Sequence, residues 1–316
     1  MKMMTRVETL DATESILEKA GFQLSERCTA RRSCFDLAAR KKEQLALIKV
    51  PTNIGSIHAK CASALQMVSN YFQAAPLFIG EKSREKPLED DTVYSRYSMY
   101  ALNFKTLEDI TCREICPLVE AGPGGYYVKL DGATIRKKRQ KLGLSVGKLA
   151  EMVGISRRTL YGYENDMAKA SVSSTYKLEW ILGIPLIQPI DVFRTELQSK
   201  GFFAAARRMF VKNRFLKTIM RKFAYFNLNA APTERTPFDF IAQFPEEHVN
   251  IIGGVTDRKE QNVDQRAEEI ISVSKIVEAQ PVFITEGPKL QNDDIPLICY
   301  EELMKIRHSR EFINLL

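Results

Sequence analysis

The sequence predicts a mixed α/β protein in which two duplicated α/β lobes flank a central all-α domain. Three observations lead to this prediction. Two segments of the chain resemble one another, the residues between them have the apolar spacing of short helices, and clusters of Gly and Pro separate the parts. We therefore expect a first lobe at residues 1–121, a helical domain at 126–193 and a second lobe at 197–316.

The internal repeat is clearest in two segments of equal length. Residues 68–81 read VSNYFQAAPLFIGE, and residues 273–286, which lie 205 positions further on, read VSKIVEAQPVFITE. Upstream, the sequence CFDL at 34–37 corresponds to PFDF at 237–240. The offset is 203 positions for this pair and 205 for the longer one, and this near-constant spacing predicts one structural unit that occurs twice.

Each copy has the same expected order of elements. An apolar strand, at 45–50 or 249–255, precedes a helix, at 58–72 or 263–277, and further short strands follow. Continuous apolar strands beside crossover helices are typical of a mixed sheet covered by helices. The cluster AGPGG at 121–125 is expected to end the first lobe.

The stretch from 145 to 164 has the pattern of two short helices joined by a tight turn. Ser145 and Ser156 are good N-cap residues, because a Ser hydroxyl accepts a hydrogen bond from an otherwise unpaired backbone N–H. Gly154 stands where a helix end favours a positive φ. The apolar positions expected to face the core are Leu149, Ala150, Val153, Leu160 and Tyr163.

On these residues, the segment 133–193 resembles the Cro/repressor-type, XRE-like helix-turn-helix domain, without a gap from Ile135 to Ile184. The resemblance implies that the second helix of the motif enters the major groove of DNA. Arginine suits this role, because its guanidinium makes two hydrogen bonds to guanine. The DNA-binding residues that the resemblance implies are Ser145, Lys148, Ser156, Arg157, Arg158, Thr159, Tyr161 and Gly162.

The chain departs from the pattern of that family at several positions. Val146 stands where Gln is frequent, and Gly147 costs about 1 kcal/mol of helix stability relative to Ala. Asp166 and Ala170 replace the usual Gly and Pro after the second helix. An alternative interpretation is a helical module that packs against a protein partner without reading DNA.

A basic helix is expected at about 202–226, with apolar residues on one face. Its other face is basic and has three interpretations: it contacts phosphates, it is only solvated, or it lies on a membrane surface. The neighbouring helix-turn-helix favours phosphate contact. Its cations are Arg207, Arg208, Lys212, Arg214, Lys217, Arg221 and Lys222.

The order of elements in each lobe resembles the restriction-endonuclease-like fold of archaeal Holliday-junction resolvases and related nucleases. In that fold an Asp and a later Glu-x-Lys hold a divalent metal. Glu14, Asp36 and Lys49 correspond to the helix Glu, the Asp and the Lys, but Leu47 replaces the second acid. The second copy keeps Asp239 and has Ile-Gly-Gly at 252–254.

A hydrolytic Mg²⁺ site needs at least two carboxylates, so both lobes are expected to be nuclease-like in shape and inactive. Asp36 is then expected to be a strand-end or capping residue. A catalytically active, structure-selective Mg²⁺-dependent nuclease is the alternative, because Glu14 could supply a second carboxylate.

Composition limits the remaining function classes. The 316 residues are 45% hydrophobic, which is sufficient for two or three folded domains, and the net charge of +7 is consistent with a polyanionic partner. No signal peptide or membrane-spanning run is evident, so a cytoplasmic protein is expected.

The cysteines predict neither zinc nor disulfide bonds. None of the six forms a C-x-x-C pair, and the three His residues are scattered, so reduced and mostly buried thiols are expected. The six are Cys28, Cys34, Cys61, Cys112, Cys116 and Cys299.

The whole arrangement resembles a family of archaeal helix-turn-helix transcriptional regulators. The resemblance implies a sequence-specific regulator that binds double-stranded DNA, and we expect it to act without a cofactor and without catalysis. A homodimer is a hypothesis, because such proteins commonly place two recognition helices about 34 Å apart. The alternatives are the nuclease and a non-catalytic protein-interaction module.

Overall fold

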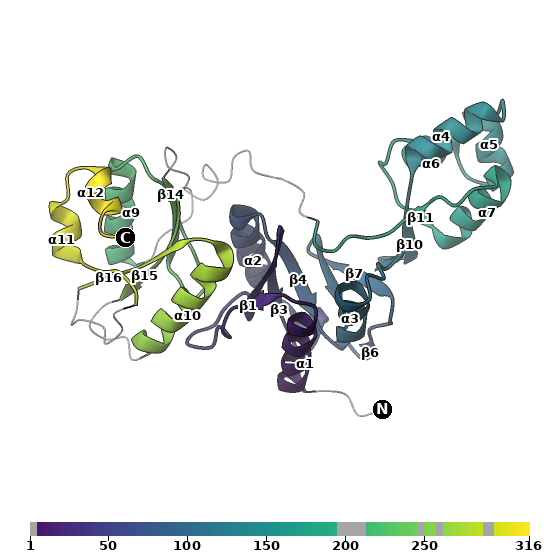
Figure 1. Ribbon diagram of the computed structural model, residues 1–316. Coiled ribbons are helices and arrows are strands. Elements are labelled where there is room, and N and C mark those ends of the chain that lie inside the picture. The colour runs from purple at the N-terminus through teal and green to yellow at the C-terminus, as the bar shows by residue number, and fades with distance from the viewer. Residues whose placement is uncertain (1–4, 195–212, 245–248, 257–261, 287–293) are drawn as a thin grey trace. The chain divides into compact units, whose positions relative to one another are not determined.

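The computed structural model describes residues 5–194, 213–244, 249–256, 262–286 and 294–316 (Figure 1). The chain divides into two compact units, which are described separately. The first contains the chain up to Ile16, Thr52–Gly55 and Phe78–Val192. The second contains Leu17–Pro51, Ser56–Leu77 and Phe193–Leu316. Each unit therefore combines segments that are distant in the sequence.

The first unit contains a small sheet that leads into the helical domain. In this sheet β8 is antiparallel to β7, β7 is parallel to β9, and β9 is antiparallel to β10. The strands are β7 (Thr92–Arg96), β8 (Met99–Leu102), β9 (Val119–Gly122) and β10 (Gly125–Leu130). The other elements before the helical domain are α1 (Arg6–Lys19), which continues into the second unit, η1 (Ile54–Ser56), β5 (Lys82–Ser83), β6 (Lys86–Pro87) and α3 (Phe104–Cys112).

The Gly- and Pro-rich cluster expected to end the first lobe forms a hairpin instead. Residues Gly122 and Gly125 pair across β9 and β10, with Pro123 and Gly124 at the turn. Gly124 has φ +91°, a conformation that suits Gly. The cluster thus forms a tight turn between two paired strands, a role that Pro-Gly sequences take as readily as that of a connection between domains.

The helical domain consists of α4 (Gly132–Lys141), α5 (Val146–Val153), α6 (Arg157–Glu164) and α7 (Val172–Leu182), which form one helical body in Figure 1. Two very short strands, β11 (Ala170–Ser171) and β12 (Ile187–Gln188), both pair with β10. The segment after α7 thus contributes a short strand, β12, to the pairing with β10.

The second unit contains the strands and helix of the first repeat. β1 (Gln23–Leu24), β2 (Leu37–Lys41) and β3 (Gln44–Lys49) pair successively in antiparallel order. α2 (Ala59–Phe72) follows, and β4 (Ala75–Ile79) crosses the boundary between the units. Strand β3 and helix α2 lie within one residue of the positions that the sequence predicts.

The second repeat forms a five-stranded sheet in the order β13-β14-β15-β16-β17, in which β15 and β16 are parallel. The strands are β13 (Asn229–Pro232), β14 (Phe240–Phe244), β15 (Val249–Thr256), β16 (Gln280–Thr285) and β17 (Leu297–Cys299). The helices are α9 (Arg214–Tyr225), α10 (Val263–Val277), α11 (Tyr300–Lys305) and α12 (Ser309–Ile313).

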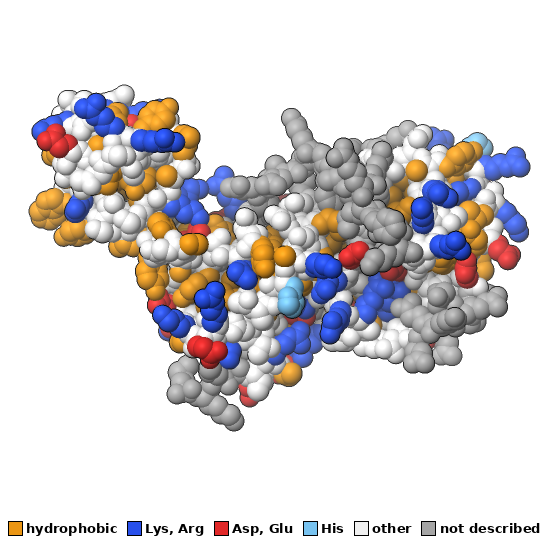
Figure 2. All heavy atoms as spheres, turned by 180° about the vertical axis from the view of Figure 1, so that it is seen from behind, with side chains coloured by type: hydrophobic (Ala, Val, Ile, Leu, Met, Phe, Trp, Pro, Cys, Tyr) orange, Lys and Arg blue, Asp and Glu red, His pale blue; other side chains and the backbone are white. Residues whose placement is uncertain are grey.

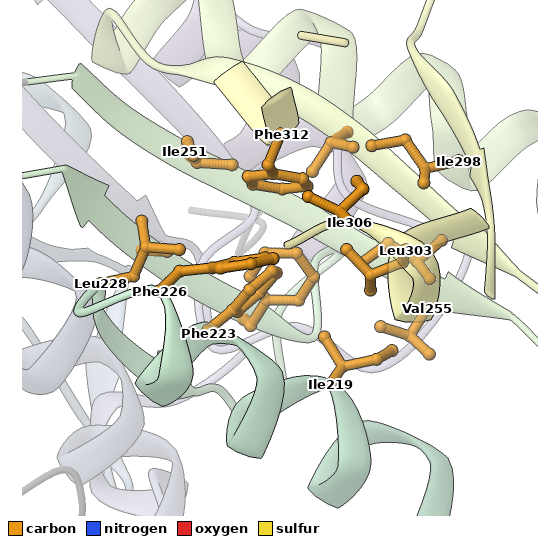
Figure 3. Packing of buried hydrophobic residues seen from close by; sticks show 14 of the residues in the cluster. Ile219, Phe223, Phe226, Leu228, Ile251, Val255, Ile298, Leu303, Ile306 and Phe312 are labelled. Carbon is orange, nitrogen blue, oxygen red and sulfur yellow. The ribbon is translucent and has the colours of Figure 1, made fainter. Parts of the chain in front are cut away.

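Alternation along the strands separates two apolar faces of this sheet. Phe240, Ala242 and Phe244 of β14 join the core beneath α9 and α12, where Phe223 and Phe312 pack with ring centroids 5.3 Å apart (Figure 3). Residues of the opposite parity point to the other face, because successive side chains of a strand alternate. Helices therefore cover the sheet as the apolar strands predict.

Candidate nucleic-acid interface and nuclease-like centre

The caps predicted for the helix-turn-helix are present. The Ser145 Oγ accepts a hydrogen bond from the Lys148 backbone N–H at 3.0 Å, and the Ser156 Oγ accepts one from the Thr159 N–H at 3.0 Å. Gly154 has φ +80° and ends α5. The two serine hydroxyls thus fix where α5 and α6 begin, and with them the position of the surface residues.

The apolar residues predicted to face the core do so. Leu149, Ala150, Val153, Leu160 and Tyr163 are all buried in one cluster. The same cluster contains residues of β10 and α7, so it joins the motif to its flanking elements. Burial of such a cluster, rather than helix propensity, stabilises helices as short as these.

A buried ion pair that sequence reasoning missed connects α4 with the end of α6. The Arg139 guanidinium binds both carboxylate oxygens of Glu164, at 2.5 and 3.0 Å, and donates a third hydrogen bond to the Leu144 carbonyl. The hydrogen bond to Glu164 raises the pKa of Arg139. No local pattern reveals a pair 25 residues apart in the sequence.

The surface of α6 presents two arginines. Arg157 and Arg158 are exposed in its first turn, and within the described part of the chain neither forms an ion pair. Tyr161, one turn further on, is 56% exposed. Figure 2 shows Lys and Arg side chains on the upper part of the helical domain. Two exposed arginines at this place have little use in packing.

The other predicted contact residues have local partners. Lys148 is exposed and forms an ion pair with Glu151 at 3.2 Å, and the Thr159 hydroxyl is 2.8 Å from the Ser156 hydroxyl. Gly162 has room for a side chain, since an added Cβ would lie 3.4 Å from Ala168. Whether these residues touch DNA stays a prediction.

The basic helix is only partly within the described residues. Arg207, Arg208 and Lys212 lie outside them. In α9, Arg214, Lys217 and Arg221 are exposed.

Lys222 does not belong to the phosphate-facing or solvated surface that the sequence predicts. Its ammonium group donates to the carbonyls of Met304 and Ile306 at 3.0 and 2.6 Å. This part of the prediction was wrong, because the helical pattern could not show that the C-terminal segment covers that position.

The nuclease-like residues of the first repeat come together in part. The Lys49 ammonium is 2.8 Å from Asp36 Oδ1, and the Val50 backbone N–H donates to Asp36 Oδ2 at 2.7 Å. Asp36 immediately precedes β2, and its role as a strand-end residue rather than a catalytic one stays a prediction. Leu47, at the position of the missing acid, is fully buried.

Glu14, the third residue of the nuclease alternative, lies in α1 and is half-buried. It belongs to the first unit, whereas Asp36 and Lys49 belong to the second. Over the residues described, no three His, Cys, Asp or Glu side chains are placed to hold a metal ion together.

In the second repeat, the corresponding aspartate is bound by two arginines. The Arg31 guanidinium donates to Asp239 Oδ1 at 2.8 Å, and the buried Arg266 guanidinium donates to Asp239 Oδ2. The Val255 N–H also donates to Oδ2, at 2.6 Å. Both carboxylate oxygens of Asp239 are thus bound by guanidinium groups.

The cysteines are free thiols, but only Cys28 and Cys34 are buried. Burial raises the pKa of the Cys28 and Cys34 thiols well above the ordinary value. Cys112, Cys116 and Cys299 are exposed, so the expectation of mostly buried thiols was wrong. Within the described ranges, no helix is both long and apolar enough to cross a bilayer.

Comparison with known protein families identifies both the nuclease-like segment and the helix-turn-helix segment of the chain. A model of the PD-(D/E)XK superfamily domain matches residues 6–117, and a helix-turn-helix model matches residues 135–187. The fold and the site thus define a helix-turn-helix protein that also contains a PD-(D/E)XK-like domain.

Full-length relatives make the assignment more specific. Proteins named "Putative HTH-type transcriptional regulatory protein" from Methanosarcina barkeri and Methanosarcina acetivorans are 34% and 35% identical to this chain. Each alignment covers 98% of this chain and 96% of the relative. A protein of the same name from Thermococcus kodakarensis is 31% identical over 99% of this chain and 96% of its own length. The chain belongs to this family of archaeal proteins.

A solved structure, the SinR protein/SinI protein complex, aligns with 29% of this chain and 77% of its own. The sequence identity is 18% and the TM-score is 0.17, and at that score the likeness supports no conclusion.

Proposed function

We propose that this chain is a cytoplasmic transcriptional regulator that binds double-stranded DNA in a sequence-specific way and does not catalyse a reaction. The observation that carries the proposal is the pair of exposed arginines, Arg157 and Arg158, at the start of a capped second helix. Membership of a family whose members are named as regulators supports it. An arginine there is well placed to reach base edges in the major groove.

In this proposal some residues of the motif contact bases and others contact phosphates. Arg158, Thr159, Tyr161 and Gly162 lie on or beside the face of α6 that would enter the groove. Ser145, Lys148 and Arg214 would lie near the phosphate backbone, whose charge dominates affinity. Ser156 would act by fixing the start of α6 through its cap.

Selection of bound duplexes from a random-sequence library, followed by affinity measurement, tests this function. The double variant Arg157→Ala/Arg158→Ala should lose at least about tenfold in affinity for a selected duplex. The double variant Lys60→Ala/Lys305→Ala is the control, because it removes the same charge from exposed positions on α2 and α11. Unchanged affinity of the arginine variant at moderate salt would favour the protein-interaction module.

We also propose that the second lobe is a diverged copy of the first, with domain boundaries near 121, 126–193 and 197. Asp36 and Asp239 have the same backbone environment, because each accepts the N–H of a residue at the end of the next strand. The rings of Phe35 and Phe238, each one residue before its aspartate, lie 6.4 Å apart.

Contacts between the two copies are also reciprocal. The Tyr71 hydroxyl of α2 donates to the Ala242 carbonyl of β14, at 2.7 Å. The Arg40 guanidinium of β2 donates to the Ile276 carbonyl of α10, at 2.5 Å. The helix of the first copy thus contacts a strand of the second, and the helix of the second contacts a strand of the first. Two identical subunits related by a two-fold axis make the same kind of reciprocal contact.

The match to the PD-(D/E)XK superfamily and the Asp36–Lys49 pair favour one second candidate, a Mg²⁺-dependent DNA nuclease. Incubation with linear and branched duplexes and Mg²⁺ or Mn²⁺ distinguishes the two. We expect intact DNA, because Leu47 supplies no carboxylate. Cleavage that is abolished by Asp36→Ala and by Glu14→Ala would establish the nuclease.

A homodimer on DNA is part of the proposal, since two copies would place two recognition helices on successive turns of the duplex. Sedimentation of the protein with and without a selected duplex tests it. A monomer in both measurements would contradict it.

A further inference from the structure

The side chain of Arg157 leaves its own helix and lies across the first turn of α5. A Cβ atom placed on Gly147 would be 2.7 Å from Arg157 Nε, 3.0 Å from Cζ and 3.1 Å from Nη2. Carbon atoms in ordinary contact stay about 3.5–4.0 Å apart. Gly147 is therefore a residue at which any side chain would displace the guanidinium.

The backbone gives no other reason for glycine at this position. Gly147 lies inside α5 and its φ is not positive, so an L-residue would be accepted without strain. A glycine within a helix costs about 1 kcal/mol relative to alanine. What the glycine provides here is space for Arg157, while the neighbouring Val146 carries no polar group.

The place where the guanidinium lies has a defined position relative to DNA in this motif. The first helix of a helix-turn-helix crosses the phosphate backbone, while the N-terminal residues of the second helix reach base edges. A guanidinium that rests on α5 is thus on the backbone side. The three atoms nearest to that Cβ all belong to Arg157, and Arg158 is the next residue of α6.

We propose that Gly147 directs Arg157 to a phosphate and thereby leaves Arg158 as the arginine that reads a base. The glycine acts as a positioning residue, and the two adjacent arginines have different roles. The inference rests on the proposed DNA binding. In this arrangement Arg157 contributes to affinity through a phosphate contact, and Arg158 contributes to specificity through a base contact.

The roles are separated by affinity measurements over a range of salt concentrations, on a duplex selected by the wild-type protein and on a scrambled duplex of equal length. Arg157→Ala should weaken binding to both duplexes by the same factor and lower the salt slope by about one. Arg158→Ala should weaken binding to the selected duplex by roughly 5- to 150-fold and change the scrambled duplex far less.

The positioning role is tested by Gly147→Ala and Gly147→Leu. Both should lower the salt slope as Arg157→Ala does, Leu more than Ala, and neither should weaken binding further when Arg157 is already Ala. Thermal unfolding is the control for folding, because Ala and Leu favour a helix more than Gly does. Both variants should unfold at or above the wild-type temperature.

Failure of the inference differs from failure of the proposed function. Wild-type protein that binds neither duplex would remove the function itself. Wild-type binding combined with an unchanged salt slope in Gly147→Leu would overturn the positioning role. Loss of sequence discrimination in Arg157→Ala would overturn the division between the two arginines.

Discussion

The two aspartates of the nuclease-like centres share a backbone role and differ in their cations. Asp36 and Asp239 each accept an N–H from the adjacent strand. Asp36 pairs with one lysine that is 18% exposed, whereas Asp239 pairs with Arg31 and with an Arg266 that is 1% exposed. Each aspartate thus combines a backbone hydrogen bond with an ion pair, and the two centres differ in the number and burial of the cations.

The residues around Asp239 are aromatic rings, glycines and a buried arginine. Gly253 and Gly254 of β15 lie against the rings of Phe240 and Phe283. The Arg266 guanidinium in turn lies 5.2 Å from the Phe283 ring centroid. The rings of Phe240 and Phe283 therefore leave no room for a side chain at either glycine, and Arg266 packs on one of these rings.

The largest effect is expected from Asp239→Ala. Its loss leaves the buried Arg266 charge without its carboxylate, and breaking a buried pair costs about 3–5 kcal/mol of stability. Denaturant unfolding measures the loss. Asp239→Asn, which keeps an oxygen for the Val255 N–H, should cost less. Equal losses would show that the charge of Asp239 is unimportant.

Gly253→Ala should follow in size. An added Cβ would lie 1.9 Å from the Phe240 ring, which is fully buried and packs on Phe223 with centroids 5.0 Å apart. Overpacking of this kind costs about 3 kcal/mol at its upper range. Unfolding of Gly253→Ala and of Gly253→Ala/Phe240→Leu checks it. The smaller Leu should restore part of the stability, and no restoration would refute the packing argument.

Asp36→Ala should cost less than Asp239→Ala, about 1–2 kcal/mol. The Val50 N–H loses its acceptor, but the Lys49 ammonium is close enough to the surface to be hydrated. The two variants are compared by denaturant unfolding under one set of conditions. A larger loss for Asp36→Ala would reverse the comparison between the two centres.

The sequence predicted those parts of the molecule whose signals are local. These parts depend on residues within a few positions of one another. They are the caps at Ser145 and Ser156, the turn at Gly154 and the apolar strand β15. A hydroxyl or a missing Cβ acts on its own backbone, so these signals do not need a tertiary context.

The parts that could not be predicted depend on contacts between distant residues. The Arg139–Glu164 pair and the Lys222 contacts with the C-terminal segment have no sequence pattern. The two-residue strands β11 and β12 are too short to show alternation. The sequence shows Gly147 only as an unfavourable residue in a helix, because its contact with Arg157 depends on how α5 and α6 pack.

The smallest expected effect concerns the carboxyl of Glu81, which is partly buried. Its buried Oε1 atom has no hydrogen-bond partner among the described residues, and burial, together with the charge of Asp90, raises the pKa of Glu81. A raised pKa in the folded state means that the ionised form is disfavoured there, so Glu81 destabilises the first unit at neutral pH. Lowering the pH through the raised pKa toward the unfolded value removes that cost.

Glu81→Gln should therefore stabilise the protein slightly at pH 7, by less than about 1 kcal/mol, and give no advantage near pH 4. Thermal unfolding of both proteins across this pH range measures the difference. An advantage that grows as the pH falls would have the wrong sign for a raised pKa. A result of that sign would show that burial of Glu81 does not disfavour its ionised form.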